Sequence, residues 1–182
     1  MGLPRKNLTR IGVLGGTFDP PHFGHLEISK FAIKKLNLKF LIWAVTKKNP
    51  LKKKSFFSLQ KRINFSSKLV SKVNRIKIET YDDVIKSSKT INLVKYLKKK
   101  YKKSEIFFLI GSDNLIKFHK WHDWKKISNF CKIIVFPRTG YLRQVFNSKA
   151  YGYLGKEKIQ FIKSKRINIS SSKIRKNYLK YN

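Results

Sequence analysis

Residues 15–25 read Gly15-Gly16-Thr17-Phe18-Asp19-Pro20-Pro21-His22-Phe23-Gly24-His25, and this stretch decides how the chain folds. It follows a short apolar run and leads into a segment where apolar residues recur at helical spacing. The glycines and prolines mark a turn, so the stretch predicts a strand that passes through a tight loop into a helix. Helix N-termini attract anions, and glycines let a ligand approach the backbone, so this loop is a natural binding site for phosphate. His22 and His25 lie three residues apart, which points both imidazoles the same way from the first helical turn.

The composition indicates one globular domain. The chain has 182 residues, 41% hydrophobic and 14% aromatic, which is ample for a core. We expect a single domain over residues 1–182, in which residues 142–182 form a small C-terminal helical segment that completes the ligand site. No run approaches the roughly 18 apolar residues of a membrane span, and no signal peptide is visible, so we expect a cytoplasmic protein. The single cysteine, Cys131, excludes an internal disulfide and fits a buried strand position.

The formal charge of +34 comes from 43 lysine and arginine residues against 9 acidic residues. Such a chain adheres to nucleic acid at low salt whatever its function is. However, the lysines are spread over every segment, whereas a nucleic-acid-binding module more often gathers arginine and aromatic residues on one face. We interpret the charge as incidental, and a functional polyanion surface is the alternative.

Apolar strands alternate with amphipathic helices along the chain. Buried strands are predicted at residues 10–15, 40–46, 76–81, 106–110 and 132–136, and helical periodicity follows each of the first three. Near-continuous apolar strands separated by helices predict a parallel sheet covered on both faces, that is, a doubly wound, Rossmann-like α/β fold. Farther along, residues 151–155 suggest a turn and residues 159–162 a brief strand.

Polar residues and glycines follow four of these strands, at residues 15–25, 47–54, 111–113 and 138–141. In doubly wound sheets, ligands bind beyond the carboxyl ends of the strands, near the switch in strand order. These four loops are therefore the predicted walls of the ligand site.

A second anion-binding segment lies near the C-terminus and reads Ile169-Ser170-Ser171-Ser172-Lys173-Ile174-Arg175. Its serines can cap a helix and donate hydrogen bonds, and Arg175 offers a planar fork for phosphate oxygens. With His22-Phe23-Gly24-His25, this segment resembles the two signatures of the nucleotidyltransferase superfamily, histidine-x-x-histidine and Ile-Ser-x-Ser/Thr-x-Ile-Arg. The two signatures occur in the right order, each beside a predicted helix N-terminus.

Segments between the two signatures resemble one branch of that superfamily, the bacterial nicotinate-nucleotide adenylyltransferases. They are Gly111-Ser112-Asp113-Asn114-Leu115, the tryptophan-rich residues 118–124, and Pro137-Arg138-Thr139-Gly140-Tyr141. The pantetheine-phosphate adenylyltransferases share both terminal signatures but lack the Gly-Gly-Thr start of the loop and the Trp121 region. They are the nearest enzymatic alternative.

The resemblance implies a reaction in NAD biosynthesis, in which AMP is transferred from ATP to nicotinate mononucleotide and pyrophosphate is released. It implies small-molecule substrates, with no membrane and no specific nucleic acid as partners. His22 and His25 would be catalytic, stabilising charge on the transferring phosphoryl group. Mg²⁺ would be held mainly by the ATP phosphates, without a protein cage. The implied ATP and phosphate site comprises Gly15, Gly16, Thr17, Phe18, Lys52, Arg138, Ser171, Ser172 and Arg175.

The same resemblance places nicotinate mononucleotide on Thr90, Asp113 and Trp121. Trp121 would stack on the pyridine ring, Thr90 would hold the nicotinate carboxylate, and Asp113 would accept hydrogen bonds from ribose hydroxyls. Many members read Thr-x-Asp-Thr-Leu at this helix start, whereas this chain reads Thr90-Ile91-Asn92-Leu93-Val94 and lacks the second threonine.

Some residues have structural interpretations that stay open. Lys52 belongs to a run of three lysines and fits solvated charge as well as a phosphate contact. Trp124 fits a core position, and Asp19 fits a side chain that stabilises a loop better than a base. A zinc site is a further alternative, without a cysteine or acidic partner at ligand spacing, and it would be formed by His22, His25, His119 and His122.

Overall fold

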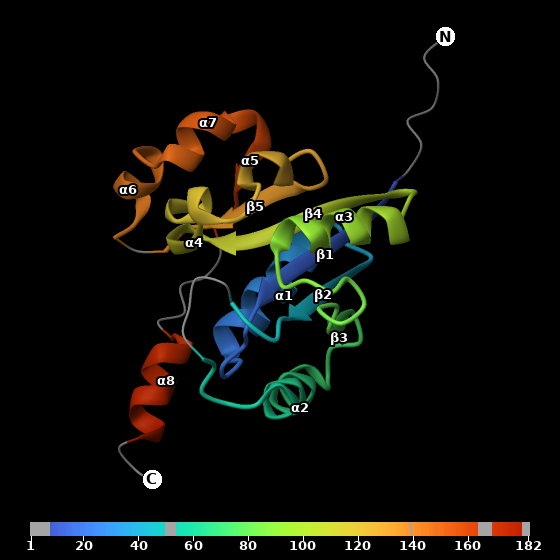
Figure 1. Cartoon of the computed structure of the whole chain (residues 1–182), viewed down its shortest axis with the longest axis vertical. Coiled ribbons are helices and arrows are strands. Elements are labelled where there is room, and N and C mark those ends of the chain that lie inside the picture. The colour runs from blue at the N-terminus through green and yellow to red at the C-terminus, as the bar shows by residue number, and fades with distance from the viewer. Residues whose placement is uncertain (1–7, 50–53, 139, 164–168, 180–182) are drawn as a thin grey trace.

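The computed structural model describes residues 8–49, 54–138, 140–163 and 169–179, and in these ranges a central sheet is flanked by helices (Figure 1). The strands are β1 Thr9–Gly16, β2 Phe40–Val45, β3 Ile76–Glu79, β4 Ser104–Gly111, β5 Lys132–Phe136 and β6 Ile159–Phe161. The helices are α1 Phe23–Lys35, α2 Leu59–Val70, α3 Thr90–Lys100, α4 Ser112–Ile116, the 3-10 helix η1 Phe118–Lys120, α5 Trp124–Ile127, α6 Leu142–Phe146, α7 Lys149–Lys158 and α8 Ser171–Tyr178.

The strands pair in the order β3-β2-β1-β4-β5-β6, and every pair is parallel. This confirms the predicted doubly wound α/β fold. The chain builds outward from β1 to β3, and α3 then carries it back to β4 on the other side of β1. The strand order therefore switches between β1 and β4, whose carboxyl ends are Gly16 and Gly111. Ligands of such sheets bind at this point.

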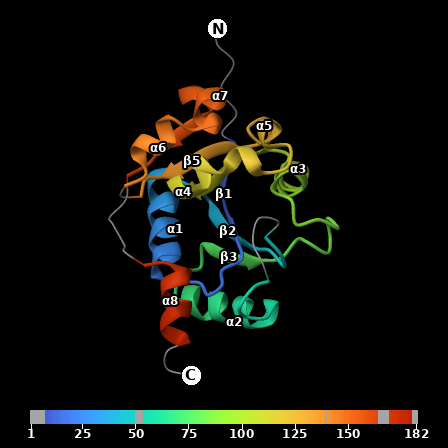
Figure 2. The ribbon, with the colours of Figure 1, turned by 60° about the vertical axis from the view of Figure 1, so that its left-hand side comes forward.

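Helices cover both faces of the sheet (Figure 2). On one face, Leu26 and Ile33 of α1 belong to the same buried cluster as Trp43 of β2. On the other face, Val94 of α3 belongs to a second cluster with Phe108 of β4. Neighbouring residues of one strand face opposite cores, which explains why the strands read as continuous apolar runs.

The predicted strand positions are confirmed to within two residues at each end. The brief strand at residues 159–162 is also present, as β6 at the edge of the sheet beside β5. In the described part of the chain, no helix is both long and apolar enough to cross a membrane.

The predicted turn at residues 151–155 is confined to a kink at Gly155, because residues 151–154 are helical within α7. The Ser148 hydroxyl caps that helix by accepting a hydrogen bond from the Tyr151 amide at 3.2 Å. Ala150 and Leu154, four residues apart, are buried against the sheet core. Only Gly155 departs from helical geometry, with a φ of 65°. Capping and burial therefore outweigh the turn-like composition of this segment.

Candidate functional site

The two signature histidines lie together at the start of α1. His22 is the N-cap residue, and its backbone amide donates to Nδ1 of His25 at 3.2 Å. Their ring centroids are 3.8 Å apart, with an angle of 31° between the planes. A Cβ on Gly24 would lie 2.9 Å from the His22 ring, so only glycine leaves room for this arrangement. The sequence spacing thus places both imidazoles side by side, as predicted.

His22 is a buried histidine with a strongly altered acidity. Only 6% of the residue is exposed. Burial, and to a smaller extent the positive charge of Arg138, lowers its pKa to about 4. Its Nδ1 is buried and has no hydrogen-bond partner among the described residues. At neutral pH the free protein therefore presents an uncharged imidazole here.

Gly15 and Gly16 end β1 without close contacts at their Cβ positions. Added Cβ atoms would come no closer than 3.4 Å to any side chain, so packing alone does not require glycine at either position. Thr17, which follows, is half-buried. Gly15 is exposed and Gly16 is half-buried, so the main chain reaches the surface where β1 ends.

The side chain of Phe18, a residue of the predicted ATP site, lies in the core. Its side chain is buried, with 3% of the residue exposed, and stacks on Trp43 at a centroid distance of 4.8 Å. Its φ of 49° lies in the left-handed region, which is unusual for a bulky residue. The ring therefore belongs to the core, and only the main chain of Phe18 is left for a substrate.

Asp19 fixes this loop to the segment that precedes α2. Its carboxylate accepts hydrogen bonds from the amides of Phe56 and Phe57, at 2.7 and 2.9 Å. The carboxylate thus has the structural role that the sequence suggested, although the amides belong to a loop far away in the chain.

Arg62 of α2 is a buried residue that sequence reasoning left out of the site. It is 2% exposed, and its guanidinium donates to the carbonyls of Thr17, Thr46, Lys47 and Phe57, at 2.6 to 3.2 Å. One side chain therefore joins the loops that follow β1 and β2 to the loop before α2.

A helical pattern contained the signal that could have revealed Arg62. The buried residues of α2 are Arg62, Ser66 and Val70, which share one helix face at intervals of four. An arginine on the inward face of an amphipathic helix must find buried acceptors.

The C-terminal signature contacts the first loop directly, although about 150 residues separate them along the chain. The Ser171 hydroxyl donates to the Pro20 carbonyl at 2.9 Å. Arg175 donates from Nη1 to the Asp19 carbonyl at 2.5 Å and from Nη2 to the Ser172 hydroxyl at 3.1 Å. Helix α8 lies near the start of α1 in both views (Figures 1 and 2). The structure thus unites the two signatures.

Asp113 and Arg138 meet beyond the ends of β4 and β5. Nη1 of Arg138 lies 3.4 Å from Oδ2 of Asp113, and the Arg138 amide donates to the Ser112 hydroxyl at 2.9 Å. A Cβ on Gly111 would lie 2.5 Å from Oδ1 of Asp113, so the glycine makes room for this pair. The other Asp113 oxygen, Oδ1, is buried and has no partner in the described ranges. Both residues therefore lie beyond the carboxyl ends of β4 and β5, next to the switch in strand order.

The remaining predicted residues lie on separate elements. Thr90 is the first residue of α3. Trp121 follows η1 and is half-buried against Phe118, with ring centroids 4.8 Å apart. Trp124 is also half-buried and contacts Phe118 and Tyr153, which agrees with a packing role. Lys52 lies outside the described residues.

No group of three or more histidine, cysteine, aspartate or glutamate side chains in the described ranges could hold a metal ion. Nδ1 of His119 lies 3.0 Å from the Ile116 carbonyl, within its own turn. The zinc alternative therefore finds no support in this part of the chain.

Comparison with known proteins agrees with this geometry. Residues 13–177 match the family described as cytidylyltransferase-like. A probable nicotinate-nucleotide adenylyltransferase of Pelagibacter ubique is 50% identical over 177 residues, covering 95% of this chain and 98% of that protein. A probable nicotinate-nucleotide adenylyltransferase of Aquifex aeolicus is 38% identical, covering 88% of this chain and 98% of that protein.

A solved structure shares the fold at much lower identity. It is the Plasmodium falciparum nicotinic acid mononucleotide adenylyltransferase complexed with NaAD, with a TM-score of 0.73 and 17% identity. The match covers 92% of this chain and 83% of that one. Together with the paired signatures at the switch point, the near full-length matches show that the chain belongs to the nicotinate-nucleotide adenylyltransferases of the cytidylyltransferase-like family.

Proposed function

We propose that the protein transfers AMP from ATP to nicotinate mononucleotide, giving nicotinate adenine dinucleotide and pyrophosphate. The observation that carries this proposal is the contact between the two signatures, through Ser171 with Pro20 and Arg175 with Asp19. The full-length similarity to nicotinate-nucleotide adenylyltransferases supports the same reaction.

The reaction is an in-line displacement at phosphorus. A phosphate oxygen of the mononucleotide attacks the α-phosphorus of ATP and forms the new P–O bond. The bond from the α-phosphorus to the oxygen that bridges to the β-phosphate breaks, and pyrophosphate leaves with the electron pair. Such chemistry demands alignment and charge stabilisation rather than a protein nucleophile.

The ATP half of the site is formed by the loop after β1 and the start of α8. The main chain of residues 15–18 would line the phosphates, and His22 and His25 would stabilise charge on the transferring phosphoryl group. Because His22 is neutral in the free protein, it would act first as a hydrogen-bond donor. The negative triphosphate would then favour its protonation. The remaining proposed contacts come from Ser171, Ser172, Arg175, Arg138 and Lys52.

A divalent ion fits this site as a companion of the nucleotide. Asp19, the carboxylate of the loop after β1, is already engaged by two amides, and the described residues offer no protein cage. Mg²⁺ keeps several waters and binds readily through phosphate oxygens, and it would neutralise charge on the triphosphate when bound. The side chains of this chain would therefore orient the nucleotide rather than bind the metal.

The nicotinate half of the site lies between α3 and the segment after β4. Thr90 would present its hydroxyl and the first amides of α3 to the nicotinate carboxylate. Asp113 would accept hydrogen bonds from ribose hydroxyls, and Trp121 would stack on the pyridine ring.

Pyrophosphate release is the direct test. The protein is mixed with ATP, Mg²⁺ and nicotinate mononucleotide, and wild-type turnover is compared with that of His22→Ala and His25→Ala. We expect turnover to fall at least about 100-fold in both variants while they remain folded. Unchanged turnover in both would overturn the roles given to the histidines.

A competition between acceptors tests the substrate. Nicotinate mononucleotide, nicotinamide mononucleotide and phosphopantetheine are offered together with ATP. A preference for phosphopantetheine would favour the pantetheine-phosphate branch. No turnover with any acceptor, combined with nucleic-acid binding that persists at moderate salt, would favour a polyanion-binding protein on this fold.

A further inference from the structure

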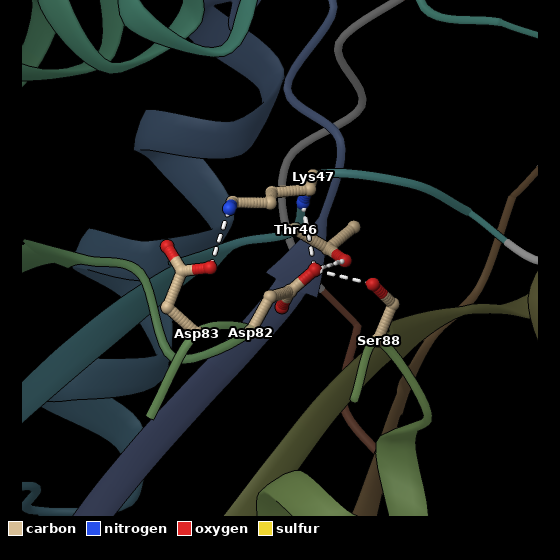
Figure 3. A network of polar contacts seen from close by, with 5 residues as sticks. All are labelled: Thr46, Lys47, Asp82, Asp83 and Ser88. Atoms are coloured by element: carbon tan, nitrogen blue, oxygen red, sulfur yellow. Dashed lines mark hydrogen bonds and ion pairs between the residues drawn. The ribbon is translucent and has the colours of Figure 1, made fainter. Parts of the chain in front are cut away.

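One carboxylate joins the end of β2 to the segment that leads into α3. Oδ2 of Asp82 accepts hydrogen bonds from the Thr46 hydroxyl at 2.8 Å and from the Lys47 amide at 2.9 Å (Figure 3). The same oxygen accepts a hydrogen bond from the Ser88 hydroxyl. A single half-buried side chain therefore collects three donors from two loops at the carboxyl edge of the sheet.

The segment between β3 and α3 is folded around Asp82. The Ile85 amide donates to the Tyr81 carbonyl at 2.9 Å, and the Ser87 amide donates to the Asp82 carbonyl at 3.0 Å. The backbone of Asp82 thus holds Ser87 while its carboxylate holds Ser88. This pair of contacts fixes the chain just before α3 begins.

The same segment continues into the first turn of α3. The N-cap residue, Lys89, makes no capping hydrogen bond with its own side chain. Instead, the Ser87 hydroxyl accepts from the Lys89 amide at 3.1 Å and from the Asn92 side-chain amide at 2.9 Å. The Asn92 side-chain amide thus ties the first turn of the helix to Ser87. Asp82, Ser87 and Ser88 therefore set where α3 starts.

The other end of the link is equally fixed. Arg62 binds the carbonyls of Thr46 and Lys47, while Asp82 binds the hydroxyl of Thr46 and the amide of Lys47. Two side chains, Arg62 and Asp82, thus hold the loop after β2 through different groups of the same two residues. Arg62 also binds the Thr17 carbonyl in the loop after β1, residues 15–18, which we call the phosphate loop. Asp82 and Arg62 therefore connect the start of α3 to the phosphate loop.

We propose that Asp82 is a positioning residue for the second substrate, because it sets the place of Thr90 relative to the phosphate loop. The proposal rests on the function proposed above and deepens it. Thr90 follows the anchored Ser88 by two residues, so a shift of this segment moves the hydroxyl and amides that would meet the nicotinate carboxylate. The ATP half is anchored separately, through Arg175 and Asp19, so the effect falls on one substrate.

Asp83 provides a matched control next to Asp82. It carries the same charge, and among the described residues its carboxylate contacts Nζ of Lys47 alone, at 2.5 Å (Figure 3). Their side chains are 76% and 46% exposed, and such pairs contribute little to stability or shape. If mononucleotide binding weakens in the Asp82 variant but not in the Asp83 variant, the cause is the position of the segment and not the loss of a negative charge.

The experiment measures KM for each substrate and kcat in Asp82→Ala, Asp82→Asn, Ser88→Ala and Asp83→Ala. For Asp82→Ala we expect KM for nicotinate mononucleotide to rise at least about tenfold, with KM for ATP within about twofold of wild type. Asp82→Asn keeps an acceptor oxygen for the three donors and should restore most of the loss. Ser88→Ala should give a smaller rise, and Asp83→Ala should match wild type.

The outcomes separate this proposal from the proposed function. A wild-type enzyme that does not adenylylate nicotinate mononucleotide overturns the function itself. A working enzyme in which Asp82→Ala leaves both KM values unchanged, or raises both equally, overturns the positioning role. If Asp82→Ala does not fold, the KM values of Ser88→Ala and Asp82→Asn decide. A rise in KM for nicotinate mononucleotide alone in Ser88→Ala supports the hydrogen bond between Ser88 and Asp82 as the positioning contact. Unchanged KM values in Ser88→Ala overturn the positioning role.

Discussion

At the scale of single residues, His22 shows how burial tunes a catalytic side chain. The imidazole is enclosed by its own loop and by the first turn of α1, and burial lowers its pKa to about 4. In the unfolded chain the pKa of a histidine is about 6.5. Between these two values the unfolded state binds more protons than the folded state. His22 therefore makes the free energy of unfolding fall as the pH decreases through this window.

The pH dependence of stability tests this account. Thermal unfolding of wild type and His22→Asn is compared from pH 7 to pH 4.5. We expect Tm to fall less steeply with acid in His22→Asn, because the variant lacks the group that gains a proton on unfolding. His122→Asn changes an exposed histidine and should follow the wild-type slope. Equal slopes in wild type and His22→Asn would contradict the buried, neutral state of His22.

Gly24 is the residue that lets the two histidines pack. In Gly24→Ala the new methyl group would lie 2.9 Å from the His22 ring and 3.2 Å from Ile169, so the ring must move. We expect turnover to fall at least about tenfold, because small displacements of a catalytic group are costly. Gly152→Ala is the control: nothing lies within 4 Å of its added Cβ, and alanine favours the helix. An active Gly24→Ala enzyme would show that the ring arrangement is not needed.

At the scale of elements, buried Arg62 organises three loops from within α2. Replacing it by leucine leaves four carbonyls without their donor. We expect Arg62→Leu to lower the free energy of unfolding by about 3 kcal/mol, measured by urea denaturation. Arg62→Lys should recover little, because an ammonium group cannot span the same acceptors. The exposed neighbour Lys61 is the control, and Lys61→Ala should stay within about 0.5 kcal/mol of wild type. A comparable loss of stability in Lys61→Ala would contradict the role given to the buried guanidinium of Arg62.

Helix α8 behaves differently, because none of its residues is buried. Polar contacts with residues 19–20 and the ring of Tyr178 against Phe56 and Phe57 hold it in place. Its role is therefore to carry Arg175 to the loop rather than to add to the core.

Arg175→Ala should separate activity from stability. We expect kcat/KM for ATP to fall about 100-fold, because a charge-assisted contact near the phosphates is lost. The Tm should change by no more than about 2 °C, because α8 contributes no fully buried residue to the core. Lys176→Ala removes the same charge from an exposed neighbour and should retain full activity. Similar losses in the two variants would point to general charge rather than to Arg175.

At the scale of the whole molecule, the charge of +34 is a source of self-repulsion. Only 9 acidic residues face 43 basic ones, so most cations cannot form ion pairs. Several of the pairs that do form, such as Lys30 with Glu27, are exposed and weak. Salt should therefore stabilise the fold by screening repulsion.

Thermal unfolding at increasing NaCl concentration tests this expectation. Between about 0.05 and 0.5 M NaCl we expect Tm to rise by at least about 3 °C, because the screening length shrinks several-fold. Binding to random DNA should disappear over the same range if the basicity is incidental. A Tm that falls with salt would show that ion pairs outweigh repulsion, and persistent DNA binding would favour a functional polyanion surface.

The strands and most of the helices could be predicted from the sequence because each depends on a local pattern of residue types. The strands were recognisable because a sheet buried on both faces requires unbroken apolar runs. The helix after β2 was recognisable from its periodicity, and Ser58 caps it within its own turn, with its hydroxyl 3.3 Å from the Lys61 amide. Helix α7 was missed because its glycines and tyrosines imitate a turn, while the burial of Ala150 and Leu154 depends on the sheet that they meet.

The sequence by itself determined the doubly wound fold, the family and the two signature segments, because these depend on residue type and spacing. Only the tertiary structure decided that Phe18 belongs to the core, that Arg62 joins three loops, and that Asp82 links β2 to α3. The reason is physical: most partners of Arg62 and Asp82 are backbone groups or hydroxyls distant along the chain, as with Thr17, which lies 45 residues from Arg62. Backbone amides and carbonyls are the same at every residue, so no pattern of residue types reveals which of them a buried charge will meet.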